Sequence, residues 1–536
     1  MITTNIKMAI PVEVPLITWA SFGASFVVAL LFAIYYICHF KSKRHSERSS
    51  TITAVLALTV AILTIAVVPI DIFTVSFLKD EDGTYKDWAT SNITRQYVTN
   101  TLLYSYYALY GCMAFFIFLA IPFVIFYYEE QDEETTTKER IWGAVKYTAC
   151  FVISAAVLLI IGAFVPLQQI PDKNSTDWEN FKYLFNELGE SKGETALYFL
   201  VGFVTLLGML GLIFYTAFGI TALPIDLIKG YRSAEEELED VQETASANRD
   251  QLRTLKRKRR RGRNLSSRER RNLEDLKDEE ELIQQRERHL VAIQKKLCYK
   301  CSCVWRPLQV VIGIVLILVA ILVFGSLFIS SLDRILHSLG YKTGYILPTS
   351  TLPNPLGMLL VVMQQVFPLD YIVFVGLVLF FIYSSMAGVR RIGIWFCCVK
   401  MYKIRPHHTK PQALLFLCMY LMILLLAVNV MLYNLAPDYM TYGHQKFLPE
   451  NSTEPEQCTT SESSSDCTMT VTMALMTKFV FQLWFFGACY YWANWAFLGF
   501  ILIGLIINLL RRRRSAIEDE VDSSDSEDSD EEMLAP

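Results

Sequence analysis

The chain has 536 residues, of which 53% are hydrophobic, and its mean hydropathy is +0.33. Its formal net charge of −4 is small because a basic central segment offsets an acidic tail. This composition excludes an ordinary soluble domain and indicates a membrane protein with several spans.

Nine apolar stretches divide the chain. A helix needs about 20 apolar residues to cross roughly 30 Å of hydrocarbon, so each stretch is predicted to be one span of an all-α polytopic membrane protein. The predicted spans lie near residues 16–38, 51–78, 101–128, 144–167, 195–225, 307–331, 356–388, 412–435 and 479–510. Because nine is odd, the two termini are expected on opposite sides of the membrane.

The basic residues predict the orientation. The gaps that open at His39, Glu129, Asp226 and Val389, with the tail after Leu510, hold or adjoin 38 of the 49 Lys and Arg residues. Basic residues favour the cytosolic side, and the bias keeps its direction, 17 against 11, when the long gap at Asp226 is set aside. A lumenal N-terminus and a cytosolic C-terminus are therefore expected, with the first span as an uncleaved anchor.

Glycosylation sequons provide an independent test of this orientation. Three begin at Asn92, Asn174 and Asn451, all in gaps assigned to the lumen, and they are predicted to carry glycans. A fourth, at Asn264, lies in a basic run on the cytosolic side and is expected to stay unmodified.

The N-terminal membrane half, residues 1–225, holds five spans and introduces a recurring pattern. Asp71 follows Pro69 by two positions, and Asp370 follows Pro368 in the same way. Proline interrupts the hydrogen bonds of a helix, and an Asp just beyond it can cap the N–H groups that the break exposes. Alternatively, Asp71 or Asp370 lines a polar pathway, because ionisable groups at membrane depth usually face a cavity.

The long gap, residues 226–306, is predicted to be a cytosolic helical hairpin. Its apolar positions follow heptads: Leu238, Val241, Ala245, Asn248, Leu252 and Leu255, then Leu276, Ile283, Leu290 and Leu297. The connecting segment 256–263 is almost all basic, and is interpreted either as a contact with anionic membrane lipid or as a solvated turn. No aromatic platform accompanies it, so nucleic acid is not an expected partner.

The second helix of this hairpin contains a possible sorting signal. Asp278, Leu282 and Ile283 have the acid-x-x-x-Leu-Leu/Ile spacing that clathrin adaptors read. The alternative is that these residues only pack the hairpin, since Ile283 also occupies a heptad position.

The C-terminal membrane half, residues 307–510, holds four spans. Its seventh apolar run is too long for one straight crossing and contains Pro368, so a half-helix is predicted before that proline. Cys458 and Cys467 share one lumenal gap, where oxidation is permitted, and are expected to form a disulfide. The alternative is two free thiols on a loop.

The tail, residues 511–536, begins with four arginines and becomes acidic and serine-rich, which predicts a disordered cytosolic segment. Ser524 and Ser529 each have an acidic residue three positions later and are candidate phosphorylation sites for an acid-directed kinase.

The sequence contains no motif for catalysis. A Gly-x4-Gly-Lys-Ser/Thr loop, a His-Glu-x-x-His helix and a Gly-x-Ser-x-Gly elbow are all missing, so we expect no enzyme, no catalytic residue, no metal site and no covalently bound cofactor. Transport is not excluded, because carriers use polar groups in their spans, but an ATP-driven step would need another subunit.

Several segments together resemble the limb-region membrane protein family, which includes the lipocalin receptor-like proteins. No single segment is diagnostic, but their order and spacing cover nearly the whole chain. They are residues 69–73, 121–124, 128–130, 227–230, 286–290, 367–371, 392–396, 411–416 and 494–499.

The resemblance implies nine spans, a lumenal N-terminus and a role in helping cobalamin (vitamin B12) leave the lysosome for the cytosol. It also implies partners: a subfamily-D ABC transporter, escorted from the endoplasmic reticulum to the lysosomal membrane, and a cytosolic cobalamin-processing chaperone. A second family role links a clathrin adaptor complex to uptake of the insulin receptor, with passage through the plasma membrane and clathrin-coated vesicles.

Three hypotheses follow. The leading one is a transport accessory that escorts a transporter, with cobalamin as the transported ligand. The rival is a carrier or receptor that binds its ligand in a polar cavity near Asp71 and Asp370. The third is an endocytic adaptor that acts through the hairpin.

Overall fold

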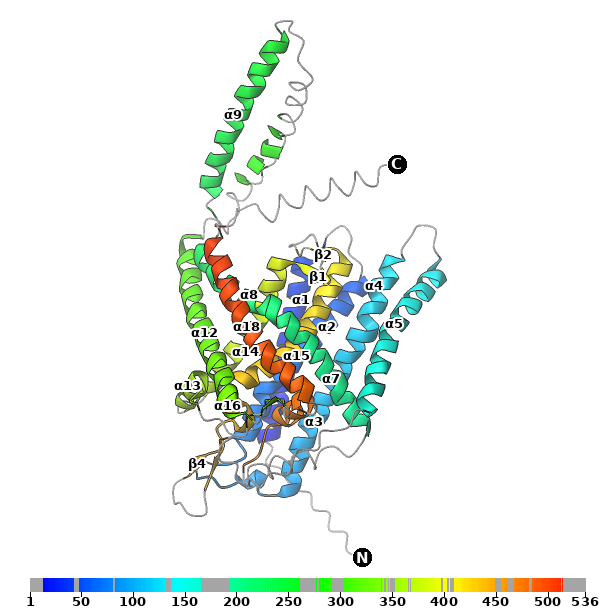
Figure 1. Ribbon diagram of the computed structural model, residues 1–536, viewed down its shortest axis with the longest axis vertical. Helices are drawn as coiled ribbons and strands as arrows, with labels where there is room; N and C mark the ends of the chain where they lie inside the picture. The colour runs from blue at the N-terminus through cyan, green and yellow to red at the C-terminus, as the bar shows by residue number, and fades with distance from the viewer. Residues whose placement is uncertain are drawn as a thin grey trace, which may run out of the picture. The chain divides into compact units, whose positions relative to one another are not determined.

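In the computed structural model of the chain (Figure 1), the residues described are 13–42, 48–80, 82–130, 136–164, 192–230, 232, 234–260, 276, 279–280, 282–284, 286–288, 290–291, 302–338, 340–341, 344–345, 347, 352–364, 366, 368–396, 399–402, 404, 409–448, 455–459, 467–481, 484–511 and 513.

These residues are helical almost throughout. The helices are α1 (Glu13–Phe40), α2 (Arg48–Ser76), α3 (Asn92–Phe115), α4 (Ile121–Glu129), α5 (Thr137–Phe164), α7 (Lys192–Gly211), α8 (Ala217–Lys229), α9 (Ala234–Arg260), α12 (Ser302–His337), α13 (Pro355–Met363), α14 (Leu369–Ile392), α15 (Pro411–Leu435), α16 (Pro437–Tyr442), α17 (Val471–Phe481) and α18 (Trp484–Leu510). A short 3-10 helix, η1 (Asp87–Ala89), precedes α3. Two π-helical segments, η2 (Phe116–Ala120) and η3 (Leu212–Thr216), join α3 to α4 and α7 to α8.

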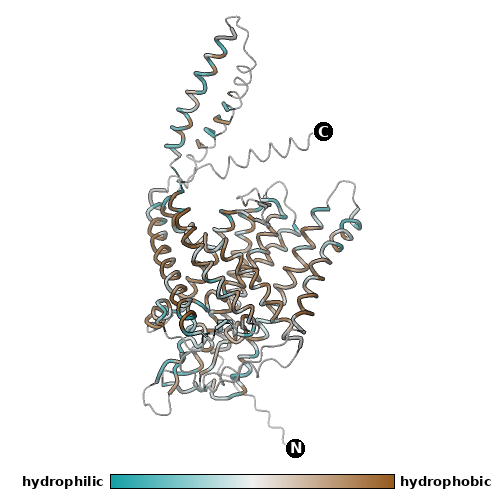
Figure 2. Tube along the Cα trace, in the orientation of Figure 1, coloured by the Kyte–Doolittle hydropathy of each residue, from teal (hydrophilic) through white to brown (hydrophobic). Residues whose placement is uncertain are grey.

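Within the described residues, nine helical runs are long and apolar enough to cross a membrane. They correspond in order to the nine predicted spans, so the prediction of an all-α polytopic membrane protein is confirmed. Figure 2 shows the hydrophobic residues that run along these helices, for example α12 and α18.

The described part of the chain also contains four short strands. Strands β1 (Ile394–Phe396) and β2 (Val399–Tyr402) pair antiparallel after α14. Strands β3 (Lys446–Phe447) and β4 (Glu456–Gln457) pair antiparallel in the loop between α16 and α17.

The chain forms two compact units. The first comprises residues 1–222 and 318–506, and the second comprises residues 223–317 and 507–536. Both predicted membrane halves thus contribute most of their spans to a single unit, while the four-part division drawn from the sequence stays a prediction.

Helix α15 is the centre of the first unit. It packs against α2 on one side and α7 on another. Most residues of α15 are buried inside the protein, whereas few residues of α5 are. The peripheral helices α1 and α5 expose large apolar side chains such as Tyr35 and Ile153, as expected for residues that face lipid.

A close contact between two glycines joins η3 and α8 to α14. A Cβ atom at Gly219 would overlap the carbonyl oxygen of Ser384, and one at Gly388 would overlap that of Tyr215. Small residues let membrane helices approach until their backbones touch, and polar side chains then bond across the contact. Here the hydroxyl groups of Thr216 and Ser385 lie 2.8 Å apart.

Two helix breaks shape the end of the first unit that holds α13, α16 and α17. The seventh apolar run divides into α13 and α14, with Pro368 directly before α14, as the predicted half-helix requires. The ninth run begins earlier than predicted: α17 starts at Val471, eight residues before the expected start at residue 479. The physical reason is that a capping group from a distant helix, described below, starts α17.

In the second unit, α9 lies beside the described residues between 276 and 291. The side-chain nitrogen of Asn248 donates to the carbonyl of Leu276 at 3.3 Å, and Arg249 pairs with Glu280 at 3.5 Å. Ala245, Asn248 and Leu252, three of the predicted heptad positions, are buried.

Two cationic side chains of this second unit bind carbonyl groups at helix C-termini. Arg306 donates to the carbonyls of Leu227, Ile228 and Lys229 at the end of α8. The Lys229 ammonium donates in turn to three carbonyls at the end of α18, at 2.7 to 2.8 Å. Cations are favoured at helix C-termini, where carbonyl groups lack partners, so the two contacts stabilise both helix ends.

Candidate functional site

A group of buried polar residues lies at the predicted lumenal ends of α2, α12, α14 and α15. Polar side chains are costly at the edge of hydrocarbon unless each finds a partner, so these contacts indicate either structural or functional selection. Three parts can be distinguished: the Asp71 cap, the Asp370 cluster and a small cavity at Arg334.

Asp71 lies two residues after Pro69 in α2 and is fully buried. Its Oδ1 accepts a hydrogen bond from the Val471 amide at 3.3 Å, and its Oδ2 accepts from the amide and the hydroxyl of Thr472, both at 2.7 Å. The Tyr106 hydroxyl is bonded to the same Thr472 hydroxyl. Asp71 therefore caps the first turn of α17, where the free N–H groups and the helix dipole favour an anion.

Asp370 is the second residue of α14 and is 1% exposed. The Tyr439 hydroxyl donates to its Oδ2 at 3.1 Å, and Nδ1 of His444 lies 3.4 Å from the same oxygen. Burial, then the Tyr371 hydroxyl and the Asp370 carboxylate, raise the pKa of Tyr439 well above its ordinary value, so its hydroxyl remains a donor.

The loop after α16 contacts both the end of α2 and the segment that precedes α17. Gly443 adopts a positive φ of 61° directly against Ser76, whose hydroxyl then accepts from the His444 amide at 3.2 Å. Gln445 donates to the carbonyl of Val75 at 3.3 Å and accepts from the amide of Thr468 at 2.7 Å. The loop thus joins the end of α2 to the segment that leads into α17.

A disulfide between Cys458 and Cys467 closes the same region. The Cys458 amide donates to the carbonyl of Gln445 at 2.9 Å, and Cys458 packs with Tyr442 and Phe447 in a small apolar cluster. The pairing is the one expected from the shared gap.

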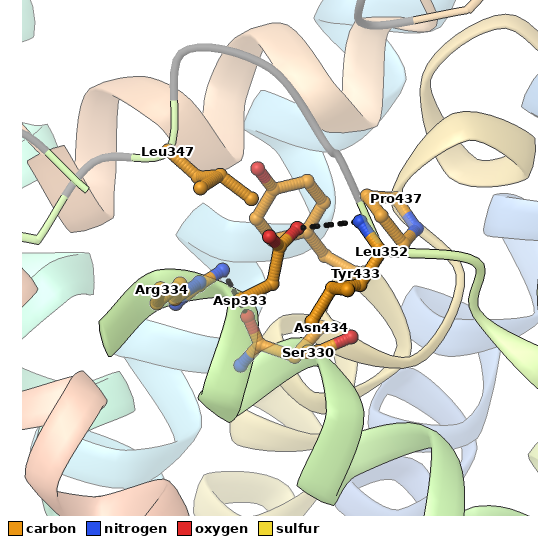
Figure 3. A pocket seen from close by; sticks show the side chains of 8 residues that line it. All are labelled: Ser330, Asp333, Arg334, Leu347, Leu352, Tyr433, Asn434 and Pro437. Carbon is orange, nitrogen blue, oxygen red and sulfur yellow. Dashed lines mark hydrogen bonds between the residues drawn. The ribbon is translucent and has the colours of Figure 1, made fainter. Parts of the chain in front are cut away.

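A cavity of about 40 Å³ lies beside these contacts, between α12, α15 and the loop before α13. Its lining residues, shown in Figure 3, are Ser330, Asp333, Arg334, Leu347, Leu352, Tyr433, Asn434 and Pro437. Asp333 and Arg334 come from the last turns of α12. Arg334 donates to Oδ1 of Asn434 at 2.6 Å, and Asp333 accepts from the Leu352 amide at 3.5 Å (Figure 3).

A second cavity, of about 20 Å³, is lined mainly by apolar side chains of α3, η2, α7 and α15, including Tyr110 and Leu426. Pockets for drug-sized ligands measure about 300–1,000 Å³. Each of these two cavities therefore has room for water or a small ion and not for a corrin ring. Asp71 and Asp370 line neither of them; in this structure both carboxylates bond helices together.

Only some of the other predicted site residues lie in the part of the chain that the structure describes. Asn92 is exposed at the start of α3, Leu282 is exposed and Ile283 is half-buried. The remaining predicted residues lie outside the described part of the chain: Asn174, Asn264, Asp278, Asn451, Ser524 and Ser529.

Sequence reasoning missed Thr472, His444, Arg334 and Asn434. Two of them carried a signal: Arg334 is a charged residue at the end of an apolar run, and Asn434 interrupts another, which marks both as costly at membrane depth. Thr472 and His444 had no such signal, because their partners lie far away in the sequence.

Comparison with known proteins identifies relatives over nearly the full length. The family model described as LMBR1-like membrane protein matches residues 19–304. A probable lysosomal cobalamin transporter from Nematostella vectensis is 46% identical, over 98% of this chain and 100% of the relative.

Two vertebrate relatives bear the name lysosomal cobalamin transport escort protein LMBD1. The protein from Danio rerio is 46% identical over 98% of this chain and 100% of the relative, and that from Homo sapiens is 46% identical over 96% of each. No solved structure matches this chain.

Proposed function

The chain belongs to the family of LMBR1-like membrane proteins, and on this premise we propose that it is an escort and accessory protein of cobalamin transport in the lysosomal membrane. The observation that carries the proposal is the identity of 46% with relatives named for this role, sustained over at least 96% of the chain. In the finer form of the proposal, the partner is a subfamily-D ABC transporter and a cytosolic cobalamin-processing chaperone joins the complex.

Two features favour an accessory over a direct carrier. The cavities of about 40 and 20 Å³ are too small for cobalamin. The carboxylates that a carrier would present to a ligand, Asp71 and Asp370, each accept hydrogen bonds from within the protein. An accessory needs no ligand-sized cavity, and it needs no nucleotide-binding loop because its partner hydrolyses ATP.

The proposed location is the lysosomal membrane, with a lumenal N-terminus and a cytosolic C-terminus. In transit the chain passes through the endoplasmic reticulum, the plasma membrane and clathrin-coated vesicles. The basic residues at the predicted cytosolic gaps support this orientation, and the relatives' names support the lysosome.

Affinity purification from lysosomal membranes tests the proposal. Tagged chain is solubilised in mild detergent, its partners are identified by mass spectrometry, and bound cobalamin is assayed with and without the ABC transporter. We expect the transporter to co-purify and cobalamin to be retained only in its presence. Cobalamin bound to the chain alone at equal molar amounts would favour the carrier instead.

Substitution of the two buried carboxylates separates the same alternatives. In cells that lack the protein, Asp71→Asn and Asp370→Asn variants are compared with Asp80→Asn, a matched change at an exposed position. If the chain is an escort, cobalamin export should fall only in proportion to transporter delivered to lysosomes. A loss of export with full delivery would support a direct role of Asp71 or Asp370 in the pathway.

A second candidate function, as an endocytic adaptor for the insulin receptor, is supported by one observation. Leu282 of the possible sorting signal is 40% exposed, so a clathrin adaptor complex can reach it. Leu282→Ala should slow receptor uptake if the signal is used, whereas Leu255→Ala, at a half-buried position of α9, should not. Equal uptake in wild type and Leu282→Ala would eliminate this role.

A further inference from the structure

The guanidinium of Arg334 is buried and forms no close ion pair with the residues that the structure describes. Arg334 is 8% exposed, and its side chain contacts Asn434 Oδ1 at 2.6 Å and the Tyr433 ring at 5.9 Å. Among the residues that the structure describes, no carboxylate lies within ion-pair distance of it. Buried charges in proteins are normally paired, because an unpaired one loses its hydration without compensation.

The surrounding chain offers little to neutralise this charge. From Ile335 to Leu369 the sequence contains no Asp or Glu, so this segment, which contributes Leu347 and Leu352 to the cavity, has no carboxylate side chain. The C-terminal end of α12 contributes the equivalent of about half a negative charge, which offsets only part of the guanidinium. Asp333 lines the same cavity and its charge acts on Arg334, but its carboxylate hydrogen-bonds to His337 at 2.8 Å and to the Leu352 amide and not to the guanidinium.

Further hydrogen-bond donors line the same cavity. The Nδ2 atom of Asn434 is buried and has no partner among the described residues. The Ser330 hydroxyl accepts from Asn354 at 3.0 Å, which leaves its own proton to donate. Figure 3 shows that Arg334, Asn434 and Ser330 reach the cavity from α12 and α15.

We propose that this cavity binds a small inorganic anion of the size of chloride. Arg334 supplies the charge, and the Asn434 amide and Ser330 hydroxyl supply further hydrogen bonds. A volume of about 40 Å³ has room for one such ion with about one or two water molecules. The inference rests on this geometry and not on the proposed role in cobalamin transport.

Thermal unfolding of the purified full-length chain tests this site. Sodium chloride is titrated against sodium gluconate at constant ionic strength and constant pH. Chloride at ten times its Kd should raise the unfolding temperature by about 1 °C, with a saturable dependence on concentration. Gluconate, which is too large for the cavity, should have no effect.

Asn434→Asp is the decisive variant. It places a carboxylate at the 2.6 Å position beside Arg334, so the site carries its own counter-ion. We expect this variant to lose the chloride dependence while its unfolding temperature in gluconate equals or exceeds that of the wild type. Arg334→Gln should also lose the dependence, and Asn434→Asp keeps the test valid if Arg334→Gln does not fold.

Two results would overturn the proposal. An unfolding temperature of the wild type that is the same in chloride and gluconate means that the cavity holds only water. A chloride dependence that persists unchanged in Asn434→Asp means that the anion binds elsewhere on the chain.

Discussion

A carboxylate buried at the end of a membrane helix is stable only where several donors surround it. Asp71 meets this condition with two amide groups and one hydroxyl of α17, all contributed by residues about 400 positions away in the sequence. Its side chain therefore determines where α17 starts, and the contact joins the first membrane half to the last.

Removal of this carboxylate should be costly. Asp71→Ala leaves the Val471 and Thr472 amides buried without their acceptor, and each unsatisfied group costs about 1–3 kcal/mol. We expect a loss of about 3 kcal/mol in the free energy of unfolding, measured by denaturant titration of the purified chain. Asp80→Asn, at an exposed carboxylate, should stay near the wild type; equal losses in both variants would contradict the assignment of Asp71 as a cap.

At the residue scale, the sequence identified two buried carboxylates but not the groups that donate hydrogen bonds to them. The Pro-x-Asp pattern selected Asp71 and Asp370, and both are buried in polar contacts. The prediction that Asp71 caps N–H groups of its own helix, next to Pro69, was wrong. The N–H groups that it binds belong to α17. Such a partner depends on the packing of distant helices, which no local pattern contains.

Among the elements, the contact of α14 with η3 and α8 depends on glycine. At Gly388 a Cβ atom would overlap the Tyr215 carbonyl, whereas at Gly376 of the same helix it would meet no atom within 4 Å. The two positions therefore form a matched pair, one inside the contact and one outside it.

Gly388→Ala should destabilise the protein by about 1–3 kcal/mol, because the two backbones must separate to admit one methyl group. Gly376→Ala should be neutral or stabilise by up to about 1 kcal/mol, because alanine is the better helix former. Unfolding temperatures of the two variants, measured in the same detergent, decide the matter. A loss at Gly376 as large as that at Gly388 would show that the helices do not meet at this glycine.

The predicted hairpin contains a polar residue at a heptad position. Asn248 is buried, and its side-chain nitrogen lies 3.3 Å from the carbonyl of Leu276 and 3.4 Å from Glu279. A single polar residue in such a contact fixes the register of two helices at some cost in stability.

Asn248→Leu should therefore strengthen the hairpin and loosen its register. With cysteines placed at Arg249 and Glu280, whose side chains meet at 3.5 Å, a short cross-linker should react efficiently in the parent chain and less in the Asn248→Leu variant. Thr244→Leu, a change at an exposed position of α9, is the control and should leave the yield unchanged. An undiminished yield in Asn248→Leu would assign Asn248 no role in register.

The elements themselves were largely predictable from hydropathy. Nine apolar runs of sufficient length and a proline at Pro368 determine the spans and the break between α13 and α14, because both depend on local composition. The π-helical segments η2 and η3 and the early start of α17 were not predictable. They arise where one helix adjusts to another, as η3 does against α14.

For the whole molecule, the orientation in the membrane determines which compartment each site meets. The Arg334 cavity, the Asp370 cluster and the disulfide all lie in or beside gaps that the charge bias assigns to the lumen. A disulfide is stable in such a compartment and is rare in the cytosol, so its presence in that gap agrees with the predicted orientation.

Glycan mapping tests this orientation directly. Because glycans are added only on the lumenal side, Asn92, Asn174 and Asn451 should each be modified, and Asn264 should not. Single Asn→Gln changes at the first three positions should each remove one glycan from the apparent mass, and enzymatic deglycosylation should bring all variants to one size. The Asn264→Gln variant should migrate with the wild type. A glycan on Asn264 would reverse the predicted sides and place the Arg334 cavity in the cytosol.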